Sequence, residues 1–335
     1  MKFKSFFSTI DSHTGGQPTR TIIGGIPPIP GESISQKMLY LQKNMDWIRR
    51  SLMFEPRGHS IMSGAILVEP IDKRADYGVI FIETGGYLPM CGHDTIGVCT
   101  ALVESGMVEV TEPETIITLE TPAGLTQARV EVRDCTAVSV SLKNIPSFVM
   151  AADTEVDVPG FGKIVMDVAY GGNPYIIVPA SAFDLQLKPE TASQIIDLGR
   201  LIRTSLNSQI KIQHPEKPFI DCCTHVQFYS EPSSQNAHAK NAVFFANSGI
   251  DRSPCGTGTS ARLALLHAQG KLAVNEEFIH ESIIGSIFKA RILEKTKVGE
   301  FEAVIPEITG SAHIIGFNHL VIDPEDPHKF GYLLD

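Results

Sequence analysis

Two cysteines in this chain, Cys91 and Cys255, stand in short loops of the same design. Each is followed by a glycine and a stretch of helical character, and each stretch stops at a glycine, Gly106 or Gly270, 15 residues beyond the cysteine. The first amides of a helix have no carbonyl partner within the helix, and the helix dipole is positive there. Such an end lowers the pKa of a thiol and binds anions. The loops therefore predict a duplicated unit that presents two thiols and two anion-binding helix ends.

This equipment suits one kind of chemistry. Two thiols on opposite sides of a carbon could remove a proton from one face and return a proton to the other, while the helix ends hold a carboxylate. The helical stretches are expected over residues 97–104 and 260–269.

Other interpretations remain open from the residues alone. A free cysteine is often a small buried hydrophobic residue. The run from Ser253 to Ser260 could bind an anion, although it lacks the lysine of a phosphate-binding P-loop. His93 could be the base of a cysteine protease, but it lies only two residues from Cys91. A zinc site is a further option, although the spacing of its candidate ligands is wrong for zinc; these are Cys91, His93, Cys222, Cys223 and His225.

His93 and Asp251 flank the two cysteines. They are either hydrogen-bonded loop residues or the groups that bind the polar part of a substrate and tune the thiols. An anionic Asp251 suits a substrate ammonium group. The polar motifs at residues 11–16 and 55–59, which contain Asp11, His13, Arg57 and His59, are equally compatible with structural turns and with pocket walls. We predict none of these four as catalytic.

Composition limits the class of protein. The 335 residues are 43% hydrophobic, enough for a large core and more than one domain. A net charge of −10 argues against a nucleic-acid partner. No apolar run approaches the ~20 residues of a membrane span, and residues 1–10 have no signal-peptide pattern. We therefore expect a cytoplasmic, soluble protein whose six cysteines are thiols.

The remaining sequence reads as many strands with one main helix per half. Ser33 is expected to cap a helix whose apolar face runs from Ile34 to Leu52, and a second helix is expected over residues 192–206. Strands are expected on both sides of the turn at residues 122–124. This pattern predicts an α+β protein with two similar lobes, residues 1–147 carrying Cys91 and residues 148–317 carrying Cys255.

The cysteine motifs resemble those of the proline racemase family, which also contains 4-hydroxyproline epimerases and trans-3-hydroxyproline dehydratases. The resemblance covers nearly the whole chain, including residues 11–14, 55–59, 281–285 and 308–324. It implies a fold like that of diaminopimelate epimerase, with two pseudo-symmetric lobes, each a strand-rich barrel around a central helix, and the active site in the cleft between them. It further implies that residues from about 318 to 335 return to the first lobe, and that the protein is a homodimer using neither pyridoxal phosphate nor metal.

The resemblance also implies roles for particular residues. Cys91 and Cys255 match the two catalytic bases. The matching substrate-binding residues include four whose backbone N–H groups would hold the carboxylate, two side chains beside the thiols, and two phenylalanines, each ten residues before a cysteine, that would enclose the proline ring. These are Gly92, His93, Gly256 and Thr257 for the carboxylate, His93 and Asp251 beside the thiols, and Phe81 and Phe245 for the ring.

Four positions bear on the reaction and the substrate. Dehydratases of the family usually carry threonine where this chain has Cys255, which favours two-base inversion. Retention of both Phe81 and Phe245 favours unsubstituted proline, whereas Pro174 stands where the family more often has an aromatic residue. We therefore predict a cofactor-independent proline racemase. The alternative is a 4-hydroxyproline 2-epimerase, followed by a trans-3-hydroxy-L-proline dehydratase or a non-catalytic amino-acid binder.

Overall fold

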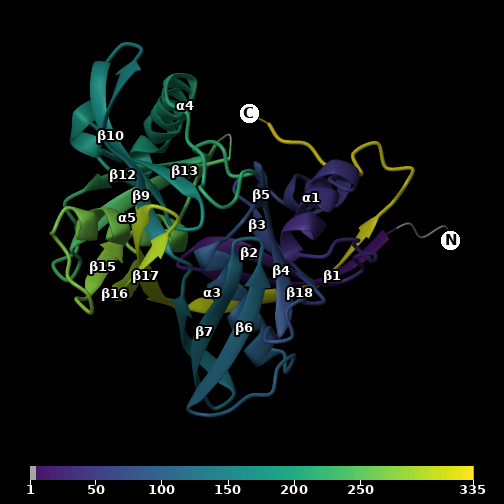
Figure 1. Cartoon of the computed structure of the whole chain (residues 1–335). Coiled ribbons are helices and arrows are strands. Elements are labelled where there is room, and N and C mark those ends of the chain that lie inside the picture. Colours follow the sequence, from purple (N-terminus) through teal and green to yellow (C-terminus); the bar gives the residue numbers. More distant parts are fainter. Residues whose placement is uncertain (1–4, 247, 335) are drawn as a thin grey trace. The chain divides into compact units, whose positions relative to one another are not determined.

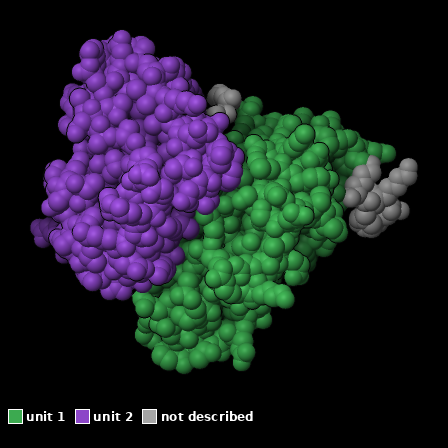
Figure 2. Space-filling model, in the orientation of Figure 1, with its two compact units in different colours: residues 1–142, 310–335 green, residues 143–309 purple. Residues whose placement is uncertain are grey.

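The computed structural model describes residues 5–246 and 248–334. The chain divides into two compact units, coloured separately in Figure 2. Unit 1 comprises the chain up to Leu142 together with the segment from Gly310, and unit 2 comprises Lys143–Thr309. Each unit is built from a strand-rich sheet and one central helix, which is labelled α3 in unit 1 and α5 in unit 2 (Figure 1).

The sheet of unit 2 closes on itself. Each strand pairs with the next along the chain, and the last pairs back with the first through Ala303–Phe148 and Val304–Ser147. The β11–β12 and β13–β15 pairs are parallel, and the others are antiparallel. The eight strands are β9 Ser147–Val158, β10 Gly162–Tyr170, β11 Pro174–Pro179, β12 His225–Ser230, β13 Ala239–Phe245, β15 Phe278–Glu281, β16 Ile287–Val298 and β17 Phe301–Gly310.

Unit 1 repeats this order of pairing. Its β2–β3 and β4–β6 pairs are parallel, and its β1–β2, β3–β4, β6–β7 and β1–β18 pairs are antiparallel. A short strand comes just before the cysteine in each unit, β5 Gly86–Leu88 and β14 Gly249–Ile250. The strands of unit 1 are β1 Ser5–Thr14, β2 Gln17–Gly24, β3 Ser63–Val68, β4 Tyr77–Glu83, β6 Glu114–Thr121, β7 Gly124–Arg133, β8 Thr136–Lys143 and β18 Ala312–Ile322.

The central helices, α3 Gly92–Glu104 and α5 Gly256–Ala268, have the same length and the same ends. Each begins directly after its cysteine, earlier than the sequence predicted. After each helix comes a glycine, Gly106 or Gly270, with φ +68°, a left-handed conformation that costs glycine little. Nearly every residue of both helices is buried, because strands surround them. The predicted α+β fold, a duplicated barrel around a helix, is confirmed.

Other helices lie between β2 and β3 in unit 1 and between β11 and β12 in unit 2. In unit 2 this is α4 Ala192–Gln209, as predicted. In unit 1, Ser33 caps α1 Ile34–Asn44 as predicted, accepting from the Gln36 N–H at 3.2 Å. The single helix expected as far as Leu52 is instead broken: α2 Trp47–Met53 begins after Asp46, whose carboxylate binds Arg49 at 2.7 Å. Short 3₁₀ turns cover Ala180–Phe183 and Pro189–Thr191.

No helix among residues 5–246 and 248–334 is long and apolar enough to cross a membrane.

The loop between β10 and β11 approaches α5 so closely that only glycine fits at one position. A Cβ on Gly171 would lie 2.2 Å from the Thr257 carbonyl oxygen and 2.5 Å from the Ala261 nitrogen. Both neighbours are helix backbone and cannot move aside. We expect Gly171→Ala to lower the free energy of unfolding by about 1–3 kcal/mol, measured as a lower thermal midpoint. Gly24→Ala is the control, since its nearest contact would be an ordinary 3.6 Å. Equal midpoints for the two variants would contradict this packing.

Candidate active site

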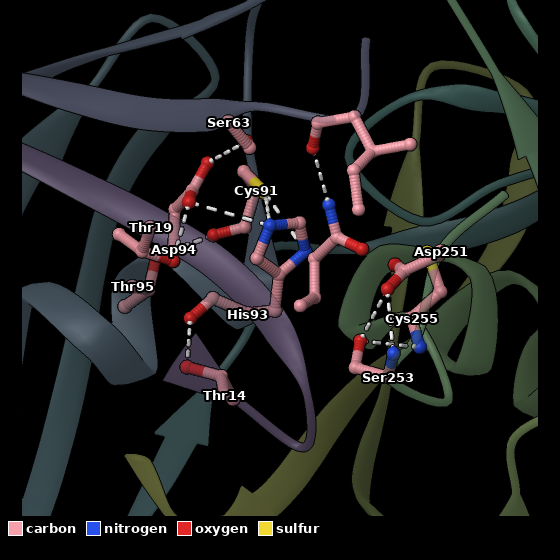
Figure 3. A network of polar contacts seen from close by, with 12 residues as sticks. Thr14, Thr19, Ser63, Cys91, His93, Asp94, Thr95, Asp251, Ser253 and Cys255 are labelled. Carbon is pink, nitrogen blue, oxygen red and sulfur yellow. Dashed lines mark hydrogen bonds and ion pairs between the residues drawn. The ribbon is translucent and has the colours of Figure 1, made fainter. Parts of the chain in front are cut away.

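Cys91 occupies the N-cap position of α3, with extended backbone at φ −140° and ψ 117°. Its thiol is only 4% exposed, and Sγ lies 3.5 Å from Nδ1 and 3.7 Å from Nε2 of His93. The Thr95 N–H and hydroxyl both donate to the Cys91 carbonyl, at 3.1 and 2.7 Å, which fixes the first turn of the helix. The thiol is therefore held beside an imidazole at the helix start (Figure 3).

The imidazole of His93 is in turn held by a buried carboxylate. His93 Nε2 lies 3.3 Å from Asp94 Oδ1, and Asp94 accepts hydrogen bonds from the Thr19 hydroxyl at 2.8 Å and the Ser63 hydroxyl at 2.6 Å. Thr14 donates to the His93 carbonyl at 2.9 Å (Figure 3). Burial alone would raise the pKa of Asp94, but His93 and the two hydroxyl donors hold that pKa below its ordinary value. The carboxylate is thus ionised and anchors the histidine.

Burial has the opposite effect on the neighbouring thiol. It raises the pKa of Cys91 well above the ordinary value of a thiol, the Asp94 carboxylate raises it further, and His93 opposes both. Loss of solvation therefore outweighs the lowering that a helix end alone would produce. Burial therefore favours the protonated form of Cys91.

Cys91, His93 and Asp94 also have their ligand atoms within 4.8 Å of one another, the one such group among the residues that the structure describes. Both oxygens of Asp94 already accept protein hydrogen bonds. Two other candidate zinc ligands lie outside this group. Cys222 is exposed, and the ring of His225 packs against that of Tyr175 with 4.8 Å between the ring centroids. The three grouped side chains form a hydrogen-bonded thiol, imidazole and carboxylate.

Cys255 occupies the N-cap position of α5, but its surroundings differ. Its sulfur, 5% exposed, accepts from the Gly258 N–H at 3.4 Å and lies 3.2 Å from the Tyr175 hydroxyl. The Tyr175 hydroxyl also lies 2.6 Å from Thr257 Oγ1, which accepts from Asn173 Nδ2 at 3.5 Å. This thiol is surrounded by hydroxyl and amide groups instead of an imidazole.

The loop before Cys255 is braced by Asp251. Asp251 is 3% exposed, and its Oδ1 accepts from both the N–H and the hydroxyl of Ser253, each at 2.8 Å. The Ser253 hydroxyl accepts from the Cys255 N–H at 3.1 Å (Figure 3). The carboxylate therefore positions the cysteine through one serine. Its predicted contact with a substrate ammonium group remains a prediction.

The repeat makes the two sites comparable position by position. Asp94 and Gly258 each stand third after their cysteine. The strand partners that bind Asp94, Thr19 and Ser63, are paired with each other across the parallel strands β2 and β3. In unit 1, an aspartate on the helix therefore meets two hydroxyls from the strands.

In unit 2 the same places hold different residues. Tyr175 and His225 are paired across the parallel strands β11 and β12. A Cβ on Gly258 would lie 3.2 Å from Cε1 of Tyr175 and 3.1 Å from the Cys255 sulfur. The ring of Tyr175 thus fills the space that the Asp94 side chain uses in unit 1, and glycine at 258 makes room for it.

Phe81 and Phe245 are both buried, but they do not hold equivalent positions. Phe245 pairs with Gly249 of β14, whereas in unit 1 it is Glu83 that pairs with Gly86 of β5. Gly86 lies one residue closer to its cysteine than Gly249 does. Two residues at the same distance from their cysteines, such as Phe81 and Phe245, therefore take different positions in the strand pairing.

The motifs at residues 11–16 and 55–59 contribute structural contacts. Asp11 pairs with Arg20 at 2.8 Å, and both side chains are largely buried. Arg57 donates to the carbonyl of Ser51 at 2.7 Å and to that of Lys329 at 2.6 Å. These contacts tie the first strands of unit 1 to α2 and to the C-terminal segment.

Sequence reasoning missed the residues that complete both sites. Asp94 follows His93 directly, and the position of these two polar residues in the first turn of a buried helix was an available signal. Tyr175 lies 80 residues before Cys255, and no spacing links them. Thr14, Thr19 and Ser63 are ordinary strand residues in sequence, so only the fold reveals them.

The chain resembles known proteins over its full length. The family model described as proline racemase matches residues 9–333. A proline racemase of Acetoanaerobium sticklandii is 49% identical, with 99% of each chain covered. A 4-hydroxyproline 2-epimerase of Streptosporangium roseum is 48% identical over 100% of each chain.

The structure leads to the same group of proteins. A solved hydroxyproline epimerase from Agrobacterium vitis, with bound trans-4-hydroxy-L-proline, matches with a TM-score of 0.96 at 36% identity, covering 100% of this chain and 96% of its own. The two buried cysteines at the starts of duplicated helices thus stand in a chain that belongs to the proline racemase family of isomerases, which includes proline racemases and 4-hydroxyproline epimerases.

Proposed function

We propose that this protein is a cofactor-independent proline racemase that interconverts L- and D-proline, with Cys91 and Cys255 as its two bases. The observation that carries the proposal is the placement of each cysteine. Each caps a helix buried within its unit, and each sulfur has its own set of polar partners. Two thiols prepared in different ways suit a reaction that needs one proton acceptor and one proton donor at the same time.

The first requirement of the reaction is a stabilised carboxylate. The α-proton of proline is weakly acidic, and its loss spreads negative charge onto the carboxylate. The N–H groups of Gly92, His93, Gly256 and Thr257 belong to first helical turns, where no intrahelical carbonyl pairs with them. In a site without water, such fixed donors stabilise developing charge more than water would. We assign these four residues to the substrate carboxylate.

The second requirement is the exchange of proton roles. One cysteine as thiolate takes the α-proton, and the other as thiol delivers a proton to the opposite face. The roles are reversed for substrate of the opposite hand. The pKa of Cys91 is raised by burial and by Asp94 and lowered by His93, so these two side chains tune its proton in opposite directions. Asp251 is assigned to the substrate ammonium group. The proposal extends to a cytoplasmic homodimer, as the family resemblance suggests.

The second candidate is a 4-hydroxyproline 2-epimerase. Relatives of both activities are about equally similar to this chain, and the similar hydroxyproline epimerase was solved with trans-4-hydroxy-L-proline bound. Phe81 and Phe245 support proline, because an apolar wall offers a hydroxyl group no hydrogen bond. An apolar pocket rejects an added hydroxyl by only ~10²-fold, so activity on both substrates is compatible with these residues.

Proton NMR in D₂O tests the function directly. The purified protein is incubated with L-proline or with trans-4-hydroxy-L-proline, and loss of the α-proton signal is followed together with chiral analysis. We expect faster exchange and inversion of proline. Faster reaction of the hydroxylated substrate would make the protein an epimerase, and exchange of neither would exclude both activities.

Serine replacement tests the two bases. Serine is ionised far less readily than cysteine, so we expect Cys91→Ser and Cys255→Ser each to reduce inversion at least ~100-fold, the scale of a lost general acid or base. Cys222→Ser is the matched control because Cys222 is an exposed thiol, and its rate should equal that of the unsubstituted protein. Full activity in either site variant would refute the two-base mechanism.

Alkylation tests whether the thiols line the substrate site. Iodoacetamide should inactivate the protein, and pyrrole-2-carboxylate, a planar carboxylate that resembles the deprotonated substrate, should slow inactivation. Benzoate at the same concentration serves as the reference anion. If pyrrole-2-carboxylate protects no better than benzoate, the reactive thiols do not belong to a site shaped for proline.

A further inference from the structure

The two sulfurs have different hydrogen-bond environments. Cys255 Sγ accepts from the Gly258 N–H at 3.4 Å and lies 3.2 Å from the Tyr175 hydroxyl. Cys91 has the ring nitrogens of His93 at 3.5 and 3.7 Å, and a hydrogen bond from the Asp94 N–H also lowers the pKa of this thiol, against the larger effect of burial. Cys255 caps its helix with its sulfur, the arrangement that places a thiolate at the positive end of a dipole, and the Tyr175 hydroxyl is the neighbour that distinguishes it from Cys91.

The hydroxyl groups around Cys255 form a chain that begins at an amide donor. The amide nitrogen of Asn173 can only donate, and it donates to Thr257 Oγ1 at 3.5 Å. The Tyr175 hydroxyl lies 2.6 Å from Thr257 Oγ1 and 3.2 Å from the Cys255 sulfur. When the Thr257 hydroxyl donates to Tyr175, the Tyr175 hydrogen is available to the Cys255 sulfur, which is then the acceptor at the end of the chain. Donation to the charged form of an acid favours that form.

The backbone supports the same arrangement. Cys255 has φ 62° and ψ 107°, which a residue with a side chain rarely adopts. This conformation directs the sulfur over the first turn of α5, where Gly258 donates to it. Cys91, in the equivalent position, has ordinary extended backbone. Of the two cysteines that precede the central helices, only Cys255 has this strained conformation.

We propose that Tyr175 is a positioning residue that holds Cys255 as the thiolate in the free protein, while Cys91 is the protonated partner. This inference deepens the proposed function. One consequence rests on that function: the free enzyme is ready to remove the α-proton from one enantiomer of the substrate. The titratable groups nearest this arrangement are His225, whose ring packs against Tyr175 at 4.8 Å, and Asp251, which reaches the Cys255 N–H through Ser253.

The test measures each thiol separately and needs no turnover. The full-length protein is pulsed with iodoacetamide across a range of pH, and alkylation of Cys91 and Cys255 is quantified by peptide mass spectrometry. In the unsubstituted protein we expect Cys255 to react first. Tyr175→Phe removes only the hydroxyl and should slow alkylation of Cys255 at pH 7 about tenfold, the scale of one hydrogen bond to a charged group. Alkylation of Cys255 should also require a higher pH in this variant, and the alkylation rate of Cys91 should be unchanged.

Two further variants separate this role from a structural one. Thr257→Val removes the hydroxyl that orients Tyr175 and should slow alkylation of Cys255 in the same direction. Tyr170→Phe is the matched control: Tyr170 is buried in the same unit, and its hydroxyl has no hydrogen-bond partner among the described residues. It should leave both thiols unchanged. Thermal unfolding confirms that each variant is folded.

The outcomes distinguish this inference from the proposed function. Unchanged alkylation of Cys255 in Tyr175→Phe, or faster reaction of Cys91 in the unsubstituted protein, overturns the role of Tyr175 even if the protein racemises proline. If the alkylation results hold but neither proline nor hydroxyproline exchanges its α-proton, the thiolate assignment stands and the proposed function fails.

Discussion

A helix enclosed by strands cannot leave its first amides to water, and this constraint governs both units. Unpaired buried N–H groups are costly, so the start of such a helix needs an acceptor or a bound anion. In both units the chain places cysteine and glycine there, and buries nearly the whole helix behind them. Close packing follows from the same enclosure, as at Gly171, whose missing side chain lets the loop approach α5. The fold thereby creates two amide-rich positions, one at the start of each central helix.

The two units keep the same frame but differ in the chemistry beside the sulfur. In unit 1, Asp94 fixes His93 next to Cys91. In unit 2, Tyr175 occupies the corresponding space next to Cys255. The two sulfurs therefore have different polar partners although they begin equivalent helices. The residue at the third position of each central helix, Asp94 or Gly258, accounts for much of this difference between the surroundings of the two sulfurs.

Much of this could be predicted from sequence because it is local. The stop glycines, the Ser33 cap and the paired Cys-Gly motifs depend on neighbouring residues, and the structure has all three. The contact of Tyr175 with Cys255 depends on which strand crosses the start of α5, and no local pattern carries that information.

Two other differences have physical causes. Spacing from the cysteines suggested that Phe81 and Phe245 are equivalent, but the strand hairpins before the cysteines differ by one residue, which changes the register. The pKa of Cys91 is raised although it lies at a helix start, because burial outweighs the dipole. Burial is a property of the whole unit and cannot be read from a motif.

The pairing of β1 with β18 has a consequence for synthesis on the ribosome. β1 pairs along its whole length with the strand that is made last, from Ser5–Ile322 to Thr14–Ala312. Unit 2 is one continuous segment, whereas unit 1 is interrupted by it. During translation, unit 2 can close while β1 still has an open edge, and an open strand edge is prone to pair with other chains. The Cys91 unit is therefore completed last, and a nascent chain that stalls before residue 312 leaves that edge exposed.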